Sequence, residues 1–162
     1  MKEVMEREIE LEVNGARRRT ICEPRTTLVD VLREQLGLTG THVGCEHGVC
    51  GACTILIDGA PMRSCLMFAV QAVGAKLTTV EGLSPPGELN DLQRAFQAHH
   101  ALQCGFCTPG MLASATALLA ESTKPSEHEV RVALSGNICR CTGYQPIVAA
   151  VLDCARSRAA KP

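Results

Sequence analysis

Hydrophobic and acidic residues alternate near the start of the chain. Ile9, Leu11 and Val13 are separated by single glutamates, a period of two that predicts a strand buried on one face. The pair Asn14-Gly15 follows and is a strong signal for a tight hairpin turn. We therefore expect residues 17–22 to form the partner strand.

The next segment passes from a helical spacing to short strands. Apolar residues over 27–36 fall on one face of a helix, and a glycine follows where a helix C-cap belongs. The four glycines within 40–51 predict a loop. Two short runs, 52–57 and 61–66, flank an Asp-Gly turn, and a last strand is expected over 76–80. A small mixed sheet with one helix is consistent with a β-grasp, ferredoxin-like domain.

Helical spacing dominates after a change of composition at residues 81–87, which hold two glycines and two prolines. We place a linker there. Four helices are predicted: around Leu89, Leu92 and Phe96; after Thr108-Pro109, read as a cap followed by proline at the first helical position; after the Ser126–Glu129 capping box; and over 147–152. The predicted fold class is α+β, with a β-grasp domain over 1–82 and a four-helix domain over 83–162.

The composition is typical of a cytoplasmic protein that binds metal. Of 162 residues 46% are apolar but only 2% aromatic, so the cores must be aliphatic, and metal clusters would be natural staples. The net charge of −1 indicates no nucleic-acid footprint, and no apolar run approaches the roughly 20 residues that span a bilayer. The N-terminus has no signal-peptide pattern. In a reducing cytosol, ten cysteines indicate metal or redox chemistry rather than disulfides.

Four cysteines in the first half have the spacing of an iron–sulfur site. They read C-x4-C-x2-C-x11-C and are Cys45, Cys50, Cys53 and Cys65. The first three have the plant-type [2Fe–2S] spacing. Three glycines beside them would let backbone N–H groups reach the sulfurs: Gly44, Gly48 and Gly51. Zinc usually takes pairs of C-x2-C, and a Rieske site needs two histidines, so both alternatives fit poorly. His42 and His47 are expected to be loop residues.

The second group of cysteines is less specific by spacing alone. It combines C-x2-C with a distant C-x-C and comprises Cys104, Cys107, Cys139 and Cys141. On spacing, zinc is an even rival to an iron–sulfur cluster. Each pair precedes a predicted helix, however, and free N–H groups at helix N-termini stabilise anions. The two helix starts would then face each other across a negatively charged cluster.

Several residues near these groups have simpler interpretations. Cys22 and Cys154 lie outside both groups and are expected to be small buried hydrophobes. Arg140 stands between two candidate ligands, where it would either face the cluster charge or be solvated. His99 and His100 are expected at a helix end on the surface.

Three strings in the chain resemble one known family. They are CEHGVCGACTILIDG from Cys45, QCGFCTPGM from Gln103 and NICRCTGYQPI from Asn137. They are similar to the iron–sulfur subunit, or iron–sulfur segment, of molybdenum hydroxylases, the xanthine oxidase family. The similarity runs from about residue 7 to residue 152 and meets no departure at a ligand position. It favours an iron–sulfur cluster at the second group too.

The resemblance implies an electron path through this chain. It implies a [2Fe–2S] cluster on each group of four cysteines, the first facing a medium FAD subunit and the second facing a large molybdenum–pterin subunit, in a dimer of heterotrimers. Gln103 and Cys141 would lie against the pterin. Electrons would pass one at a time from molybdenum through the second cluster and the first to FAD. Small subunits of carbon monoxide, aldehyde and N-heterocycle dehydrogenases share these features, so the resemblance selects no substrate.

No bond-making active site is expected on this chain. It has no dinucleotide-binding fingerprint and no P-loop, so its role would be electron transfer, with no catalytic residue of its own. Two other functions stay open at this point. A free two-cluster ferredoxin usually carries a strongly acidic surface, whereas this chain balances 16 basic against 17 acidic residues. A zinc-stabilised interaction module would require the first motif to be accidental.

Overall fold

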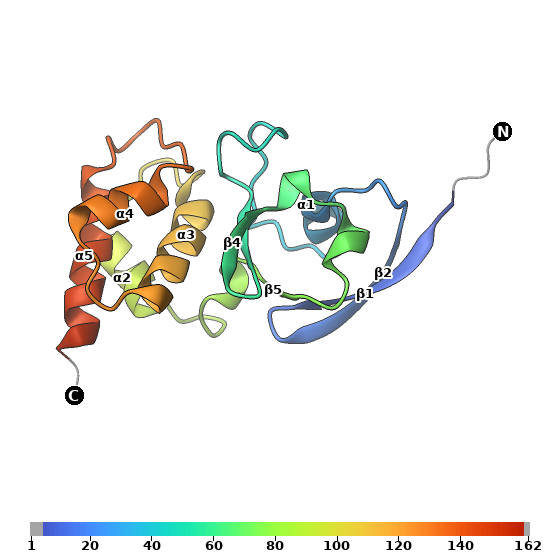
Figure 1. Ribbon diagram of the computed structural model, residues 1–162, viewed down its shortest axis with the longest axis horizontal. Helices are drawn as coiled ribbons and strands as arrows, with labels where there is room; N and C mark the ends of the chain where they lie inside the picture. Colours follow the sequence, from blue (N-terminus) through green and yellow to red (C-terminus); the bar gives the residue numbers. More distant parts are fainter. Residues whose placement is uncertain (1–4, 161–162) are drawn as a thin grey trace.

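The structure is a computed structural model that describes residues 5–160, and its two halves lie side by side along the long axis (Figure 1). Within these residues the first half holds a mixed sheet of order β2-β1-β5-β3-β4. The strands are β1 Arg7–Val13, β2 Ala16–Cys22, β3 Thr54–Ile57, β4 Ala60–Arg63 and β5 Lys76–Thr78. The second half holds helices, so the predicted α+β order of a β-grasp domain followed by a helical domain is confirmed.

The first hairpin forms as predicted. β1 and β2 pair antiparallel, and the turn residues Asn14 and Gly15 have φ values of 53° and 75°, which these two residue types tolerate well. The alternating residues of β1 face inward, where Leu11 is fully buried. β5 then pairs parallel to β1, which closes the mixed sheet of a β-grasp.

The helix predicted over 27–36 is present but changes its winding. The Thr27 side chain caps the α-helical segment α1, Leu28–Asp30, and a π-helical segment, Val31–Gln35, continues it. Within the π segment the N–H of Leu36 donates to the carbonyl of Val31 at 3.0 Å. The apolar face predicted from the sequence still packs on the sheet, because Leu28, Val31 and Leu32 are buried in its core.

The strands predicted over 61–66 and 76–80 are both shorter than expected. β4 ends at Arg63, and a 3₁₀ turn, Ser64–Leu66, replaces the rest of the first strand. The Ser64 hydroxyl donates to the carbonyl of Cys53 at 2.7 Å, which bends the chain and brings Cys65 beside Cys53. β5 ends at Thr78, because Thr79 N–H donates to the Asn14 side chain rather than to a strand partner.

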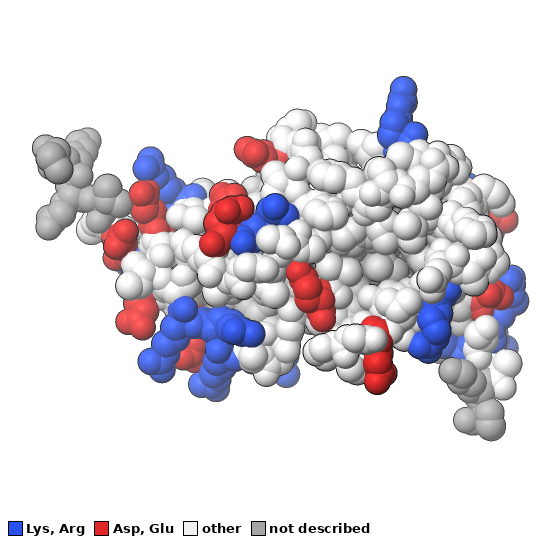
Figure 2. Space-filling model, turned by 180° about the vertical axis from the view of Figure 1, so that it is seen from behind, with Lys and Arg blue, Asp and Glu red and all other residues white. Residues whose placement is uncertain are grey.

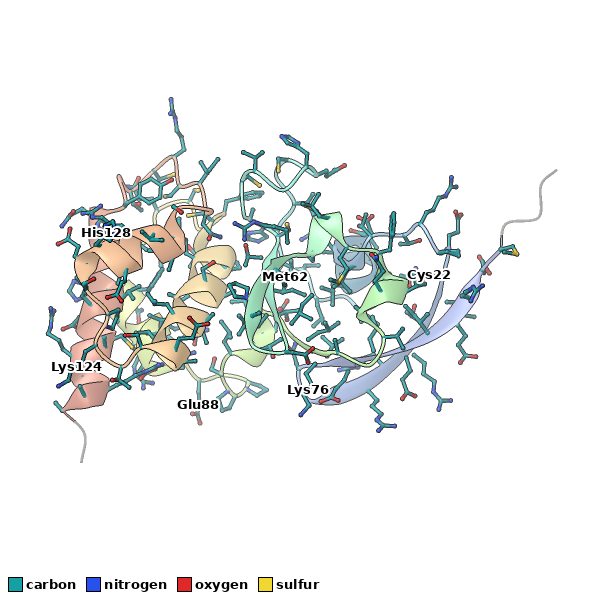
Figure 3. All side chains as sticks on the ribbon, in the orientation of Figure 1. Cys22, Met62, Lys76, Glu88, Lys124 and His128 are labelled. Atoms are coloured by element: carbon teal, nitrogen blue, oxygen red, sulfur yellow. The ribbon has the colours of Figure 1, made fainter. Side chains whose placement is uncertain are left out.

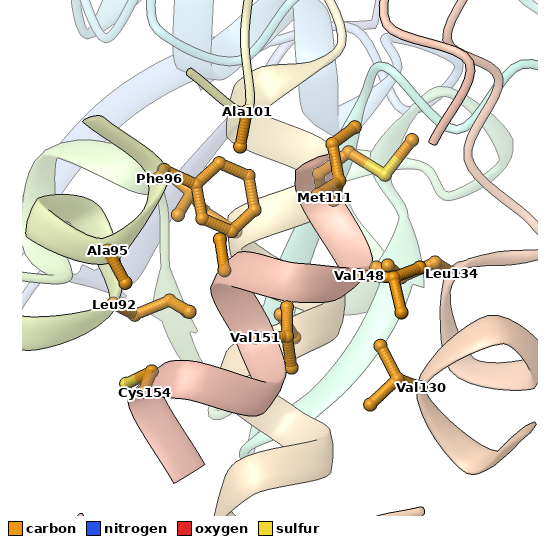
Figure 4. Close-up of a cluster of buried hydrophobic side chains, with 14 of the residues drawn as sticks. Leu92, Ala95, Phe96, Ala101, Met111, Val130, Leu134, Val148, Val151 and Cys154 are labelled. Atoms are coloured by element: carbon orange, nitrogen blue, oxygen red, sulfur yellow. The ribbon is translucent and has the colours of Figure 1, made fainter. Parts of the chain in front are cut away.

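The second half is a bundle of four helices within the described residues. They are α2 Asp91–Ala98, α3 Thr108–Glu121, α4 Glu127–Leu134 and α5 Gln145–Ala159. Figure 4 shows their shared core, in which Phe96, Met111 and Val151 are almost completely buried. The capping box at the start of α4 is confirmed, since Ser126 and Glu129 bond reciprocally.

Two details of the helix predictions were wrong. Leu89 lies before α2 and is exposed, because α2 begins only at Asp91 behind the Asn90 cap. The N-cap of α3 is Cys107 rather than Thr108, so the helix begins one residue early. This shift places a candidate ligand directly on the N-terminus of α3.

The two halves pack through α3 and the sheet. Leu56 on β3 contacts Ala113 and Ala117 on α3, and the small alanines let the helix approach the strand closely. Each half also has a core of its own. The linker over 81–87 includes Leu83, which packs against the helical core, so the domain boundary between residues 82 and 83 stays a prediction. Over residues 5–160, every helix is too short or too polar to cross a bilayer.

Candidate metal centres

The first four thiols come together at one end of the sheet. Cys45 and Cys50 lie in the loop before β3, whereas Cys53 and Cys65 are buried behind it beside Val29. The N–H of Cys50 points at the Cys45 sulfur over 3.4 Å. Such N–H···S hydrogen bonds stabilise thiolates, so the loop geometry suits anionic sulfur.

The two ends of this group differ in their acidity. Backbone N–H groups of Cys50 and His47 lower the pKa of the Cys45 thiol to about 6. Burial raises the pKa of the Cys65 thiol to about 11, and the neighbouring Cys53 adds to the rise. Cys45 is therefore mostly a thiolate at neutral pH, whereas Cys65 becomes a thiolate only when a metal replaces its proton.

The three candidate glycines are needed for different reasons. A side chain on Gly44 would begin 3.1 Å from the Cys50 sulfur, within the space that a cluster would share. Gly48 has a φ of 83°, which disfavours other residues, and a side chain there would overlap Leu66. A side chain on Gly51 would overlap the carbonyl oxygen of Gly136, which belongs to the helical half. Gly51 thus serves the contact between the halves more than the thiols.

The second four thiols come from two segments that precede α3 and α5. Cys107 and Cys139 are buried, whereas Cys104 and Cys141 are exposed on the same side, with their sulfurs 3.4 Å apart. Cys107 caps α3, and α5 begins four residues after Cys141, so the predicted position of both pairs near helix N-termini is confirmed. Helix N–H groups are therefore close to the sulfurs, where they favour negative charge.

Burial has opposite outcomes for the two inner thiols of this group. Burial raises the pKa of the Cys107 thiol to about 12, and Cys139 beside it adds to the rise. Burial would also raise the pKa of the Cys139 thiol, but hydrogen bonds from the Thr142 side chain and backbone outweigh it, so that pKa lies below its usual value. The Thr142 hydroxyl lies 3.1 Å from the Cys139 sulfur.

Tyr144 shapes this loop in a way that the sequence did not reveal. Its hydroxyl accepts a hydrogen bond from the N–H of Cys139 at 2.9 Å and donates one to the carbonyl of Asn137 at 3.3 Å. Tyr144 also has a φ of 68°, an unusual value for a non-glycine residue. The chain's single tyrosine therefore folds the second ligand loop back on itself.

All four thiols of each group influence one another, and the strongest interactions join them in pairs. Cys45 interacts with Cys50 and Cys53 with Cys65; in the second group Cys104 interacts with Cys141 and Cys107 with Cys139. A zinc ion takes its four ligands around one point, whereas a [2Fe–2S] cluster takes two thiolates on each of two irons.

Two buried hydroxyls, each close in sequence to one of the groups, have no hydrogen-bond partner among the described residues. In the described part of the chain, the hydroxyls of Thr41 and Thr108 are the buried side-chain oxygens that make no hydrogen bond. Thr108 follows Cys107 directly, and Thr41 precedes Cys45 by four residues. Buried polar groups normally find partners, and a sulfur-rich anionic cluster supplies acceptors, so the donors present fit such a group.

The two thiol groups are connected at the contact between the halves. The N–H of Ile138 donates to the carbonyl of Cys50 at 2.8 Å, so residues next to or within both groups share a hydrogen bond. His42 stacks on Phe106 with ring centroids 4.8 Å apart, and its Nδ1 lies 2.8 Å from the Phe106 carbonyl. His42 is thus a loop residue, as predicted, and it also joins one ligand loop to the other.

The surface around the outer thiols is apolar and uncharged in large part. Gln103, Cys104 and Cys141 are exposed together, with the exposed side chains of Leu102 and Phe106 beside them. Leu66 and Val49 are exposed beside the first group. From behind, Figure 2 shows a broad area without charged side chains in the upper right part of the molecule, whereas several acidic side chains lie below it near the middle. Exposed apolar surface of this kind marks an interaction site.

The other residues singled out in the sequence lie away from the thiol groups or on the surface. Cys22, the last residue of β2, is buried in the core of the first half (Figure 3), and Cys154 is buried in the helical core (Figure 4), as predicted. His99 pairs with Asp153 at 3.1 Å, Arg140 is exposed, and the Nδ1 of His47 contacts the carbonyl of Cys45. His47 is therefore a loop residue whose ring faces the backbone.

Two family models match almost the whole chain. The model described as 2Fe-2S iron-sulfur cluster binding domain matches residues 11–78. The model described as [2Fe-2S] binding domain matches residues 79–152. Each match contains one group of four cysteines, so the chain carries two [2Fe–2S]-binding domains.

Proteins of known function resemble the chain along most of its length. The nicotine 6-hydroxylase small subunit of Paenarthrobacter nicotinovorans is 61% identical over 146 residues, which cover 90% of this chain and 88% of that subunit. Caffeine dehydrogenase subunit gamma of Pseudomonas sp. (strain CBB1) is 55% identical, with 88% and 87% covered. In the crystal structure of quinoline 2-oxidoreductase from Pseudomonas putida 86, a 59% identical chain superposes with a TM-score of 0.92, covering 95% of both chains.

Proposed function

The chain belongs to the family of two-cluster iron–sulfur subunits of molybdenum hydroxylases, and from this premise we propose how its residues carry out electron transfer. The observation that carries the proposal is that four thiols gather in each of the two domains that match [2Fe–2S]-binding family models. Each bound [2Fe–2S] cluster would take up and release one electron at a time. The chain's own residues supply the ligands, the hydrogen bonds to sulfur and the fixed spacing between the two groups.

The proposed ligands are the eight cysteines of the two groups. Cys45, Cys50, Cys53 and Cys65 would hold the first cluster, and Cys104, Cys107, Cys139 and Cys141 the second. The N–H of Cys50 and the glycine-rich loop would surround the first with donors, as Gly44 and Gly48 allow. Thr142 and the start of α3 would do so for the second. These donors offset the cost of burying a negatively charged cluster.

We further propose that the chain works inside a heteromeric complex. A large molybdenum–pterin subunit would cover the exposed side of the second group, with Gln103 and Cys141 against the pterin. A medium FAD subunit would cover the first group, and the complex would be a dimer of heterotrimers. Electrons would then pass from the molybdenum site through the second and first clusters to FAD. The exposed apolar side chains beside both groups support two such contacts.

We propose a substrate class from the similar proteins and a location from the cysteines. Nicotine, caffeine and quinoline, named for three similar proteins, are all N-heterocycles, so we propose that the complex acts on a compound of this class. Ten unpaired cysteines are typical of a reducing compartment, which supports the cytoplasm as the location.

The decisive experiment is the metal and flavin content of the native complex, isolated gently through a tag on this chain. We expect about one molybdenum and one flavin for every four irons, since each cluster holds two irons. The complex should be reduced by an N-heterocycle from a panel that also contains an aldehyde and carbon monoxide. Iron alone, with neither molybdenum nor flavin, would instead favour a free two-cluster electron carrier.

A further inference from the structure

A buried amide lies at the contact between the two halves, between the two groups of thiols. Asn137 is only 2% exposed. Its Nδ2 donates to the carbonyl of Gly51 at 2.9 Å and to the Thr54 hydroxyl at 3.2 Å, and its Oδ1 accepts from the Ser114 hydroxyl at 2.8 Å. Both ends of the amide are therefore satisfied, which fixes its orientation and offsets the cost of burying it.

Arg63 on β4 reinforces the same contact. Its guanidinium donates to the Thr54 hydroxyl at 2.6 Å and to the carbonyl of Gly136 at 2.5 Å. Asn137 thus reaches from the helical half to the first loop, and Arg63 reaches from the sheet to the second loop. We refer to Gly51, Thr54, Arg63, Gly136 and Asn137 as the seam.

The seam also leaves no room for the two backbones to shift. A side chain on Gly51 would overlap the carbonyl oxygen of Gly136, and one on Gly110 would overlap the carbonyl oxygen of Gly51. Backbone from one half therefore lies directly against backbone from the other, a closeness that only glycine permits. A polar network with all its members satisfied rigidifies such a contact.

On each side of the seam stands a residue of a ligand loop. Cys50 precedes Gly51, and Ile138 follows Asn137 and precedes Cys139. The hydrogen bond of 2.8 Å from Ile138 N–H to the Cys50 carbonyl therefore joins the two loops immediately beside the amide. Removing the hydrogen bonds of the seam would therefore weaken this bond while all cysteine ligands stay unchanged.

We propose that Asn137 is a positioning residue for electron transfer between the two clusters. By fixing the backbone at Gly51, it keeps the bond between Cys50 and Ile138 and sets the separation of the ligand loops. The inference rests on the proposed two-cluster function. Each electron lost by the reduced second cluster is gained by the oxidised first cluster, with no bond broken and no proton exchanged. Electron tunnelling weakens steeply with distance, so a fixed separation matters.

The test compares three variants of the full chain loaded with iron and sulfide. Asn137→Leu keeps the volume of the side chain but removes its hydrogen bonds. Ser114→Ala removes only the hydrogen bond that the Ser114 hydroxyl donates to the amide oxygen of Asn137. Leu56→Val is the matched control, because it trims the apolar contact of the same interface outside the seam. The readouts are iron content, hydrogen exchange of the Ile138 amide, and the magnetic splitting between the paramagnetic resonance signals of the two reduced clusters.

We expect Asn137→Leu to keep its iron, to exchange the Ile138 amide about tenfold faster, and to lose part of the splitting. Ser114→Ala should change both readouts in the same direction by less, and Leu56→Val should keep the wild-type splitting. The proposal is overturned if the seam variants keep wild-type exchange and splitting, or if Leu56→Val alters the splitting as much. Should Asn137→Leu not fold, Ser114→Ala decides. A wild-type chain without two signals would instead overturn the two-cluster function itself.

Discussion

The two groups of thiols hold the same kind of candidate site with different local structures. The first is built mainly from one loop, where glycines bring backbone N–H groups to the sulfurs and Cys45 has a lowered pKa. The second joins two distant segments at helix starts, where Cys107 is buried in the core and Tyr144 folds the loop. Backbone conformation organises the first site, whereas helix packing organises the second.

This difference predicts which part of the protein each site depends on. The first site should be sensitive to single changes of loop conformation and insensitive to the packing of the sheet below it. The second should fail together with the helical core, because Cys107 and Cys139 belong to the same cluster of buried residues as Phe96. The seam connects the sites, so each can be tested while the other serves as an internal control.

Loss of one ligand from each group is the largest change. We expect Cys50→Ser to halve the iron content, to keep the resonance signal of the second cluster, and to block reduction of the flavin by substrate while molybdenum is still reduced. Cys107→Ser should remove the other half of the iron and also destabilise the helical half, since it places a hydroxyl in the buried core of that half.

The control for these variants is Cys22→Ser, which changes a buried cysteine outside both groups and should keep both signals. Normal reduction of the flavin by substrate in Cys50→Ser would sink the proposed order of electron flow. An iron content unchanged by Cys107→Ser would remove this residue from the ligand set.

Alkylation of the metal-free chain should separate the thiols by orders of magnitude. The thiolate is the reactive form, and a pKa of about 6 leaves Cys45 mostly thiolate at neutral pH, whereas a pKa of about 12 keeps Cys107 protonated. Labelling of Cys45 by iodoacetamide should rise through pH 6 and then level off. Cys107 should stay unlabelled until strongly alkaline pH.

Peptide mass spectrometry across a pH series gives both profiles from one sample. Labelling under denaturing conditions is the control, and there the two cysteines should react alike, because the folded surroundings that shift their pKa values are lost. Equal labelling rates in the folded chain would contradict the difference between the low pKa of Cys45 and the high pKa of Cys107.

Glycine replacements test how far backbone conformation limits the first loop. Gly51→Ala would force a side chain into the carbonyl of Gly136, so we expect a loss of about 2–3 kcal/mol in the free energy of unfolding. Gly48→Ala should cost only about 1 kcal/mol, because its clash is with the movable side chain of Leu66. Gly48→Val should also impair assembly of the first cluster, since a β-branched residue resists a positive φ.

Urea unfolding of the iron-loaded chain, together with iron content, measures these effects. Leu66→Ala in the Gly48→Ala background is the matched control, and it should recover the steric part of the loss but not the part due to φ. Full iron loading in Gly48→Val would show that the first site does not need this glycine.

The sequence predicted the elements well wherever a local pattern sets the structure. The alternation in β1, the Asn14-Gly15 turn and the Ser126–Glu129 capping box depend on neighbours in the chain, and all three are present. The predicted strand over 61–66 and the predicted cap at Thr108 were wrong, because the Ser64–Cys53 bond and the packing of α3 are set by distant residues.

The sites show the same limit. The cysteine spacing marked both groups, since ligand spacing is local. The roles of Asn137, Arg63 and Tyr144 were not visible, because their partners lie in other segments or in loop conformations that no spacing encodes. The position of Asn137, two residues before the candidate ligand Cys139, is the signal that could have drawn attention to it.

The smallest expected effect tests whether the second site depends on every helix of its bundle. The Ser126 hydroxyl caps α4 by accepting a hydrogen bond from Glu129 N–H at 3.2 Å. Ser126→Ala removes this cap and should lower the free energy of unfolding by about 1 kcal/mol. Because α4 supplies no ligand, iron content and both resonance signals should stay at the wild-type level, with Ser157→Ala on the exposed side of α5 as the neutral control. Loss of the second signal alone would mean that the whole bundle holds the helix starts of α3 and α5 in place. The second site would then depend on the packing of every helix, whereas the first depends on the conformation of its loop.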